Sequence, residues 1–292
     1  MSTVMGQVDK EPIRLVIILA SGCIFENYET SRRLRNIVDC VASKFAELFL
    51  STRDDFEFRG FEIISRDCKY EDFHETHAQM QRDKPDIYLN VFLGSFTRLT
   101  SSNKQFMNCF FIPFSFVKKL PESMNNERKW SPEEKVNAKC AMAHFFHEIC
   151  HSLGGFHSDE GLMKTEFDLL ADEEITIRDI KLSNIIDKKT RTIICESMSI
   201  ITTFVPQRSL DVVDGELTYI SDQSIAAAYF LKGTKYTESF DEFNFLDALK
   251  IYTAKVPEEY DAFVVVHFCG HIYYFSRTDI QTTKRCTRVT TF

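Results

Sequence analysis

Four apolar runs in the first 120 residues predict β-strands, and an amphipathic stretch after the first of them predicts a helix. Residues 32–50 repeat apolar side chains at helical spacing. Pro113 interrupts the last of the four runs, which is typical of an edge strand. The order of strand, helix and further strands predicts an α/β layer on a mixed sheet. The predicted strands are residues 13–20, 56–65, 85–94 and 107–116.

The most clearly delimited helix of the chain is predicted from Ser131 to about Leu153. Ser131 can cap the N-terminus, Pro132 fits the first turn, and Glu134 completes a capping box with Ser131. Gly154 follows and can adopt the left-handed conformation that ends a helix. The helix therefore ends inside the segment that carries the candidate chemistry.

Beyond a further short helix predicted over 176–186, the pattern becomes rich in β-branched and aromatic residues. No glycine- or proline-rich linker marks the change near residue 190. We predict an α+β protein with two parts. The first is a domain over 1–190 with a mixed twisted sheet and an active-site helix, and the second is a β-rich region over 191–292 of unknown role. The β-rich runs are residues 191–204, 216–220, 226–231 and 262–275.

Composition and charge favour a soluble globular protein and exclude some partners. Hydrophobic residues make up 44% of the chain and charged residues 27%. The net charge of −8 argues against a general nucleic-acid binder, because no basic field is available to release counterions from phosphate. No apolar run approaches the ~20 residues that span a membrane, so we expect no membrane partner.

The number and spacing of the cysteines indicate the cellular compartment of the protein. There are nine, an odd number, with no CxxC pair, which is typical of reduced thiols in a cytoplasmic or nuclear protein. Secretion stays an alternative because of the apolar run 15–20 within IRLVIILASGC. That run is only six residues long, and Asp9 and Glu11 lie where a signal peptide is basic. A buried first strand is therefore the favoured interpretation.

The segment HEICHSLGGFHSDEGLM, residues 147–163, carries the candidate chemistry. His147 and His151 are four residues apart on the predicted helix, so their side chains project from one face, one turn apart. Gly154 lets the chain turn back and brings His157 toward the same ion. Three neutral imidazoles leave one position of a tetrahedral zinc open, which is typical of a catalytic site. We expect one Zn²⁺ per chain.

Glu148 is the candidate catalytic residue, because it neighbours a predicted ligand. Its carboxylate could take a proton from zinc-bound water as general base and pass it to the leaving amine. A histidine cluster without metal, a metal site without activity and a closed structural zinc domain are the alternatives. Glu173, some twenty residues after His151, is a rival to His157 as third ligand.

The pattern HExxHxxGxxH with the following Gly-Leu-Met resembles the metzincin zinc peptidases. The resemblance implies that His147, His151 and His157 bind zinc and that Glu148 is the general base. It also implies that Met163 belongs to a tight Met-turn beneath the metal. The segment HSDEGLMKTEF is most similar to a group of zinc metallopeptidases from fungi and invertebrates with a short HxxxG[IV]M spacing. Some members carry a lectin-like or other β-domain at the C-terminus.

The resemblance implies a zinc endopeptidase with a metzincin-like catalytic domain and a peptide or protein substrate. The sequence departs from most metzincins in the short spacing from His157 to Met163, and Thr165 stands where astacin-type enzymes carry a tyrosine ligand. The alternative is a weak or inactive metzincin-scaffold binding protein, whose C-terminal β region recognises a partner or glycan. The oligomeric state is not indicated.

Weaker signals concern a second metal site and the substrate strand. His267, Cys269 and His271 alternate on a predicted strand, where buried packing is the default and a second zinc site the alternative. Metzincins pair the substrate with an edge strand, and either 86–94 or 107–113 could serve, with an internal strand as the alternative. His144 and Cys150, which lie on the helix of the motif, are predicted to pack in the core.

Overall fold

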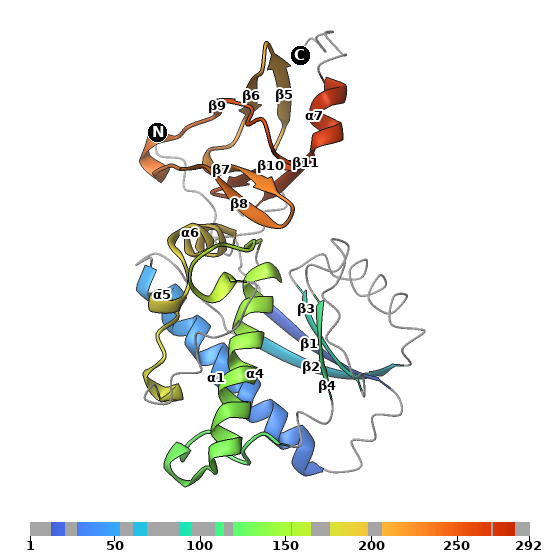
Figure 1. The fold of residues 1–292 in the computed structure, drawn as a ribbon, viewed down its shortest axis with the longest axis vertical. Helices are drawn as coiled ribbons and strands as arrows, with labels where there is room; N and C mark the ends of the chain where they lie inside the picture. Colours follow the sequence, from blue (N-terminus) through green and yellow to red (C-terminus); the bar gives the residue numbers. More distant parts are fainter. Residues whose placement is uncertain are drawn as a thin grey trace, which may run out of the picture. The chain divides into compact units, whose positions relative to one another are not determined.

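The computed structural model describes ten stretches of the chain. The described residues form two compact units, one from residues 1–153 and 160–187, the other from residues 154–159 and 188–292. Figure 1 colours them along the sequence. The described stretches are residues 13–20, 28–52, 61–68, 88–94, 109–113, 119–152, 154–164, 176–197, 206–269 and 271–283.

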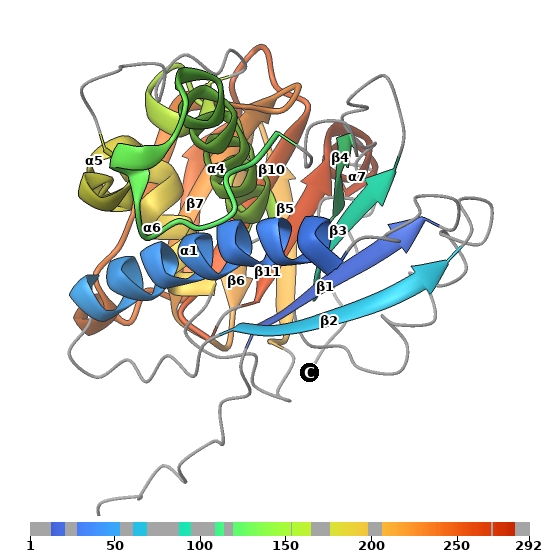
Figure 2. The ribbon, with the colours of Figure 1, turned by 90° about the horizontal axis from the view of Figure 1, so that it is seen from below.

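The first unit contains a four-stranded sheet in the order β2-β1-β3-β4. We predicted a mixed sheet, but every pairing among the described strands is parallel. Figure 2 shows β1, β2 and β3 running in the same direction. The nearly continuous apolar sequence of β1 is typical of parallel strands. The strands are β1 (Ile13–Ala20), β2 (Phe61–Cys68), β3 (Tyr88–Gly94) and β4 (Cys109–Pro113).

The two candidate substrate strands differ in their place in this sheet. β4 lies at an edge and ends at Pro113, in agreement with the prediction from that proline. β3 lies between β1 and β4, so for residues 86–94 the alternative of an internal strand applies. Of the two, only β4 is an edge strand of the described sheet.

Two long helices of the first unit pack against each other, as Figure 1 shows. They are α1 (Tyr28–Thr52) and α4 (Pro132–Ser152). The rings of Phe45 and Phe146 meet edge to face with their centroids 5.9 Å apart. α4 also contacts β3 and β4. The buried face of α1 has the predicted helical spacing and consists of Ile37, Val38, Val41, Phe45 and Leu48.

The start of α4 is set by the capping box that the sequence predicted. The backbone N–H of Glu134 donates to Oγ of Ser131 at 3.2 Å, and the N–H of Ser131 donates to Oε2 of Glu134 at 2.8 Å. These two bonds satisfy N–H groups that would have no partner within the helix. The register of α4, and with it the direction of the motif histidines, is fixed from this end.

The single helix predicted over 176–186 is wrong. The structure has the 3₁₀ turn η4 (Ile177–Asp179) and the short helix α5 (Leu182–Ile185), with extended backbone at Ile180 and Lys181. Ile180 and Leu182 are both buried, although two residues apart they would lie on nearly opposite sides of one helix. Breaking the helix turns both side chains inward.

The second unit contains two antiparallel sheets, in the orders β11-β10-β7-β8 and β5-β6-β9. A buried cluster that includes Leu217, Phe230 and Phe263 draws on strands of both sheets. The runs 216–220 and 226–231 are confirmed as strands, and the run 262–275 contains two strands, β10 and β11. The strands are β5 (Arg208–Val213), β6 (Glu216–Ser221), β7 (Ile225–Lys232), β8 (Lys235–Glu242), β9 (Ile251–Lys255), β10 (Ala262–His267) and β11 (Ile272–Ser276).

The remaining run, 191–204, is not a strand where the structure describes it. The helix α6 (Lys188–Ser197) covers its first part, and residues 198–204 lie outside the described residues. Thr190, Ile193 and Ile194 are buried at spacings of three and four, the period of a helix face. This face packs on β7 and β10. These two strands are buried almost throughout because the other sheet lies across their second face.

Two further elements complete the described parts of the chain. The 3₁₀ turn η5 (Phe245–Asp247) precedes β9, and the helix α7 (Arg277–Thr283) packs on β5 and β11. None of the helices in the described ranges is long and apolar enough to cross a membrane. Among the cysteines whose side chains are described, Cys40, Cys140 and Cys269 carry free thiols.

Candidate metal centre

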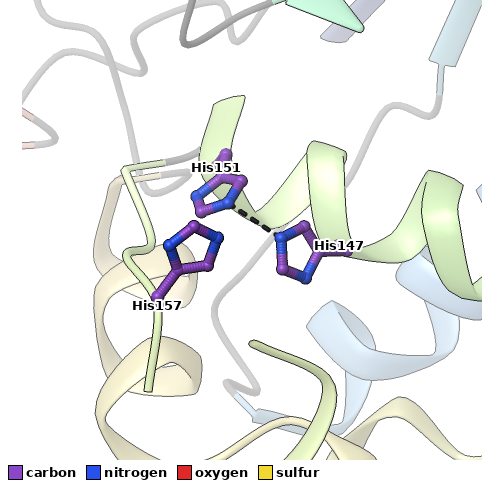
Figure 3. Close-up of side chains that lie close together, drawn as sticks. All are labelled: His147, His151 and His157. Atoms are coloured by element: carbon purple, nitrogen blue, oxygen red, sulfur yellow. Dashed lines mark hydrogen bonds between the residues drawn. The ribbon is translucent and has the colours of Figure 1, made fainter. Parts of the chain in front are cut away.

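Three histidines offer ligand nitrogens to one point. One ring nitrogen each from His147, His151 and His157 lies within 4.8 Å of the others. Figure 3 shows the three rings gathered around one point. His147 is buried, and the other two rings are partly accessible. These are the residues that the motif predicted as ligands. The structure therefore brings together a set of donors that can hold one metal ion.

His147 is oriented by a backbone carbonyl. Its Nδ1 lies 2.9 Å from the carbonyl oxygen of Leu162. In the neutral ring, Nδ1 donates its proton to that oxygen, which leaves the lone pair of Nε2 for a metal. A second hydrogen bond that fixes the tautomer and the ring plane is a regular feature of histidine ligands. Leu162 is in the 3₁₀ turn η3 (Gly161–Met163), which packs against α4.

The two helical histidines already point their ligand atoms at each other. Nε2 of His151 lies 2.9 Å from Nε2 of His147. With Nδ1 of His147 donating to Leu162, Nε2 of His151 supplies the proton of this contact in the metal-free protein. In a tetrahedral site, nitrogens bound at about 2.0–2.1 Å lie roughly 3.3 Å apart. A small rotation of either ring is enough to reach that separation.

His157 is held as part of a β-bridge in the second unit. Its N–H donates to the carbonyl of Thr234 at 2.9 Å, and its carbonyl accepts from the N–H of Tyr236 at 3.1 Å. Its Nδ1 lies 2.8 Å from Oγ1 of Thr234. Burial and the neighbouring Lys235 ammonium lower the pKa of His157. Both effects favour the neutral imidazole, the form that binds metal.

Two glycines shape the chain after α4. Gly154 has φ of +92° and Gly161 has φ of +62°, conformations that other residues adopt at a cost. The left-handed conformation predicted for Gly154 is therefore confirmed. At Gly161 an added Cβ would lie 2.4 Å from the carbonyl oxygen of Ile185, so the turn also needs the absence of a side chain. The glycine of the Gly-Leu-Met segment is required by this close approach.

Glu148 follows His147 on α4. Burial raises its pKa to about 7, because the desolvated carboxylate is disfavoured relative to the neutral acid. A dipositive ion nearby would act in the opposite direction and favour the carboxylate. A partly desolvated acid with a pKa near neutrality can exchange protons at physiological pH. Glu148 therefore has the chemistry of a proton carrier and directly follows His147 in the sequence.

Three further side chains in or near the motif, those of Met163, Cys150 and His144, are packed within the fold. Met163 is fully buried in η3 and lies next to the carbonyl that orients His147. Cys150 is fully buried, in agreement with the prediction of a core position. The pKa of His144 is lowered to about 4 by burial and by His151, so this side chain is neutral at pH 7. His144 does not belong to the ligand group.

The donor set suits a zinc ion. Imidazole nitrogens are ligands that zinc prefers, and a closed structural site takes four protein ligands. Within the described ranges, no fourth histidine, cysteine, aspartate or glutamate belongs to the group. Glu173, the rival third ligand, lies outside the described residues. His157 occupies the third place in the group.

The segment around His267 does not form a second ligand group among the described residues. His267 is completely buried, with Nε2 2.9 Å from the hydroxyl of Tyr219 and Nδ1 3.2 Å from the carbonyl of Ser224. Burial lowers its pKa to about 4. The neutral ring donates from Nδ1 and accepts at Nε2, so both nitrogens are used in packing. The default interpretation, a buried strand histidine, therefore applies.

Sequence reasoning did not identify the residues that orient the ligands. The Leu162 group is a backbone carbonyl, which carries no signal in the sequence. Thr234 is 77 positions from His157 and sits in the turn between β7 and β8. Its importance becomes visible only when β8 is placed beside residue 157.

Comparisons of the chain with protein-family models, with curated proteins and with solved structures find no significant match. The resemblance to metzincins thus depends on the motif itself and on the cluster of its three histidines. What can be stated of the site is a possible three-histidine metal centre in an α+β chain.

Proposed function

We propose that this protein is a zinc-dependent peptidase of metzincin type. One observation carries the proposal: His147, His151 and His157 place their ligand nitrogens within 4.8 Å of one another, and no fourth ligand joins them among the described residues. Three neutral donors and an open position favour a catalytic over a structural site. The site would hold one Zn²⁺.

Glu148 supports a hydrolytic role for the site. When bound, the ion would polarise the scissile carbonyl and lower the pKa of a water molecule. Glu148 would accept the proton of the attacking water and deliver it to the leaving amine. The burial that raises the pKa of Glu148 to about 7 also favours proton delivery in the second half of the reaction.

The remaining residues of the centre hold the ligands. The carbonyl of Leu162 keeps Nδ1 of His147 protonated, so that Nε2 faces the ion. The turn at Gly161 sets the position of that carbonyl. The edge strand β4 is the candidate for pairing with an extended substrate, because its outer backbone groups have no neighbour strand in the described sheet.

The test compares wild type, Glu148→Gln and the control Glu133→Gln by metal content and by cleavage of a mixed-peptide library. Glu133 is an exposed residue of the same helix, where it forms a surface ion pair with Lys119. We expect one zinc per chain in all three proteins. Chelator-sensitive cleavage is expected in wild type and Glu133→Gln, and a loss of at least about 100-fold in Glu148→Gln.

Three outcomes would contradict the proposal. Full turnover by Glu148→Gln would exclude this glutamate as the base. Zinc in all three proteins without cleavage by any would favour the alternative, a binding protein on the same scaffold that recognises a partner or glycan through its β-rich region. A zinc that leaves only when the protein unfolds would indicate a structural site.

A further inference from the structure

His157, the third ligand, is positioned in the β-rich second unit by backbone hydrogen bonds and also by side-chain contacts. Residues 154–159 belong to that unit, and His157 pairs with β8 at Lys235. The N–H of the preceding Phe156 donates to the hydroxyl of Tyr236 at 2.8 Å. The ring of Phe156 packs edge to face on Tyr236 and on Tyr229, with centroids 6.1 and 6.2 Å apart. The backbone of His157 is therefore fixed on both sides of its bridge.

With the backbone of His157 fixed, two properties of its side chain remain to be set: the rotation of the ring and its tautomer. Nδ1 lies 2.8 Å from Oγ1 of Thr234. A threonine hydroxyl can donate one hydrogen bond and accept two. If Nε2 binds an ion, it carries no proton, so the single proton of the neutral ring must sit on Nδ1. The hydroxyl of Thr234 then has to accept.

We propose that Thr234 is a positioning residue of the metal centre, whose hydroxyl oxygen accepts the Nδ1–H of His157 and so leaves Nε2 to bind the ion. This inference depends on the proposed metal site. It gives the β-rich region a role in that site: the turn between β7 and β8 supports the third ligand. The backbone carbonyl of Leu162 has the equivalent role for His147, whose Nδ1–H it accepts. Such supporting bonds typically change metal affinity by about 10–100-fold.

The experiment measures the zinc affinity of the full chain by competition with a chelator. Thr234→Val removes the hydroxyl and keeps the shape, whereas Thr234→Ser keeps the hydroxyl. Thr237→Val is the matched control, because Thr237 lies on the same hairpin and donates to the carbonyl of Phe230 instead. Thr234 is exposed, so its substitution should change stability by only about 0.5 kcal/mol.

We expect the dissociation constant for zinc to rise about tenfold in Thr234→Val, and to stay within about threefold of wild type in Thr234→Ser and Thr237→Val. The exposure of the hydroxyl places the effect at the lower end of the usual range. A second measurement reads the tautomer of His157 in the metal-free protein by long-range ¹H–¹⁵N NMR at neutral pH. Wild type and Thr234→Ser should carry the proton on Nδ1, and Thr234→Val should show a mixture.

Unchanged zinc affinity in Thr234→Val, or a wild-type His157 protonated on Nε2, would overturn the proposal. Both results can be obtained while wild type binds zinc normally, so they leave the peptidase proposal intact. Zinc binding by wild type without cleavage would refute the peptidase and leave the role of Thr234 standing. Failure of wild type to bind zinc would refute both.

Discussion

Nδ1 of His147 lies 2.9 Å from the carbonyl oxygen of Leu162. This bond connects the helix that carries two ligands with the 3₁₀ turn that follows the third. His147 is buried, so water could not easily replace this bond if it were broken. Both the ring N–H and the carbonyl would then lack a hydrogen-bond partner, which destabilises the fold. The turn around Met163 is therefore coupled to the metal centre through a ligand, and changes in the turn should alter metal binding.

Gly161→Ala should destabilise the protein and weaken zinc binding. The substitution adds a Cβ at φ of +62°, 2.4 Å from the carbonyl oxygen of Ile185. The left-handed conformation costs about 1–2 kcal/mol for a residue other than glycine, and the backbone clash should bring the total to about 3 kcal/mol. Urea unfolding gives the stability, and competition with a chelator gives the zinc affinity.

Gly215→Ala is the control for the backbone conformation alone. Gly215 has φ of +80°, but nothing lies within 4 Å of its added Cβ. It closes the turn between β5 and β6, far in sequence from the motif. We expect a loss of about 1 kcal/mol and unchanged zinc affinity. Equal losses for the two variants would show that the contact with Ile185 does not matter.

The sequence was sufficient to predict the elements whose signals are local. The capping box of Ser131 and Glu134 set the start of α4, and the glycine at 154 marked its end. The spacing of His147 and His151 placed both rings on one face. Each of these features depends on residues within one or two helical turns, so the pattern contains the information.

Features that depend on long-range packing were missed. Residues 191–197 are rich in β-branched side chains, yet they form α6, because a helical face packs against β7 and β10. The parallel sheet could not be told from a mixed one, because strand direction depends on connections rather than on composition. Thr234 meets His157 only through the pairing of β8 with a segment that lies 77 residues earlier.

His151→Ala should remove most of the affinity for zinc. The change leaves two imidazoles in the ligand group, and loss of a ligand should weaken binding by more than about 100-fold, beyond the effect of an outer hydrogen bond. In wild type, free zinc at 100 times the dissociation constant should stabilise the fold by about 2.7 kcal/mol. A thermal-shift titration with zinc measures both effects.

His271→Ala is the matched control, because this histidine stacks on Tyr273 and lies outside the ligand group. It should keep the zinc-dependent shift. Chelator should remove the shift from wild type reversibly, with an unchanged far-UV circular dichroism spectrum, because an open site can exchange metal in the folded protein. A shift that persists in His151→Ala would place the zinc elsewhere.

The buried His267 should make the second unit less stable in acid. Its pKa falls from 6.5 to about 4 on folding, mainly because burial disfavours the imidazolium, with a smaller contribution from His271. Hydrogen bonds that the ring donates to backbone carbonyls, and the charge of Asp222, act in the opposite direction. Between pH 6.5 and 4 the unfolded chain therefore binds more protons than the folded chain. Stability is complete above pH 6.5 and decreases as the pH falls toward 4.

The loss attributable to this histidine is less than about 4 kcal/mol, since one pKa unit corresponds to about 1.36 kcal/mol. His267→Gln keeps groups that can bond Tyr219 and Ser224 but cannot be protonated. The variant should be less stable at pH 7, because the ring is lost from the core, and its stability should fall less steeply with acid. Urea unfolding of both proteins between pH 7 and 4, followed by circular dichroism, gives the two slopes. Carboxylates titrate in both proteins and cancel in the comparison, so equal slopes would mean that folding does not change the pKa of His267.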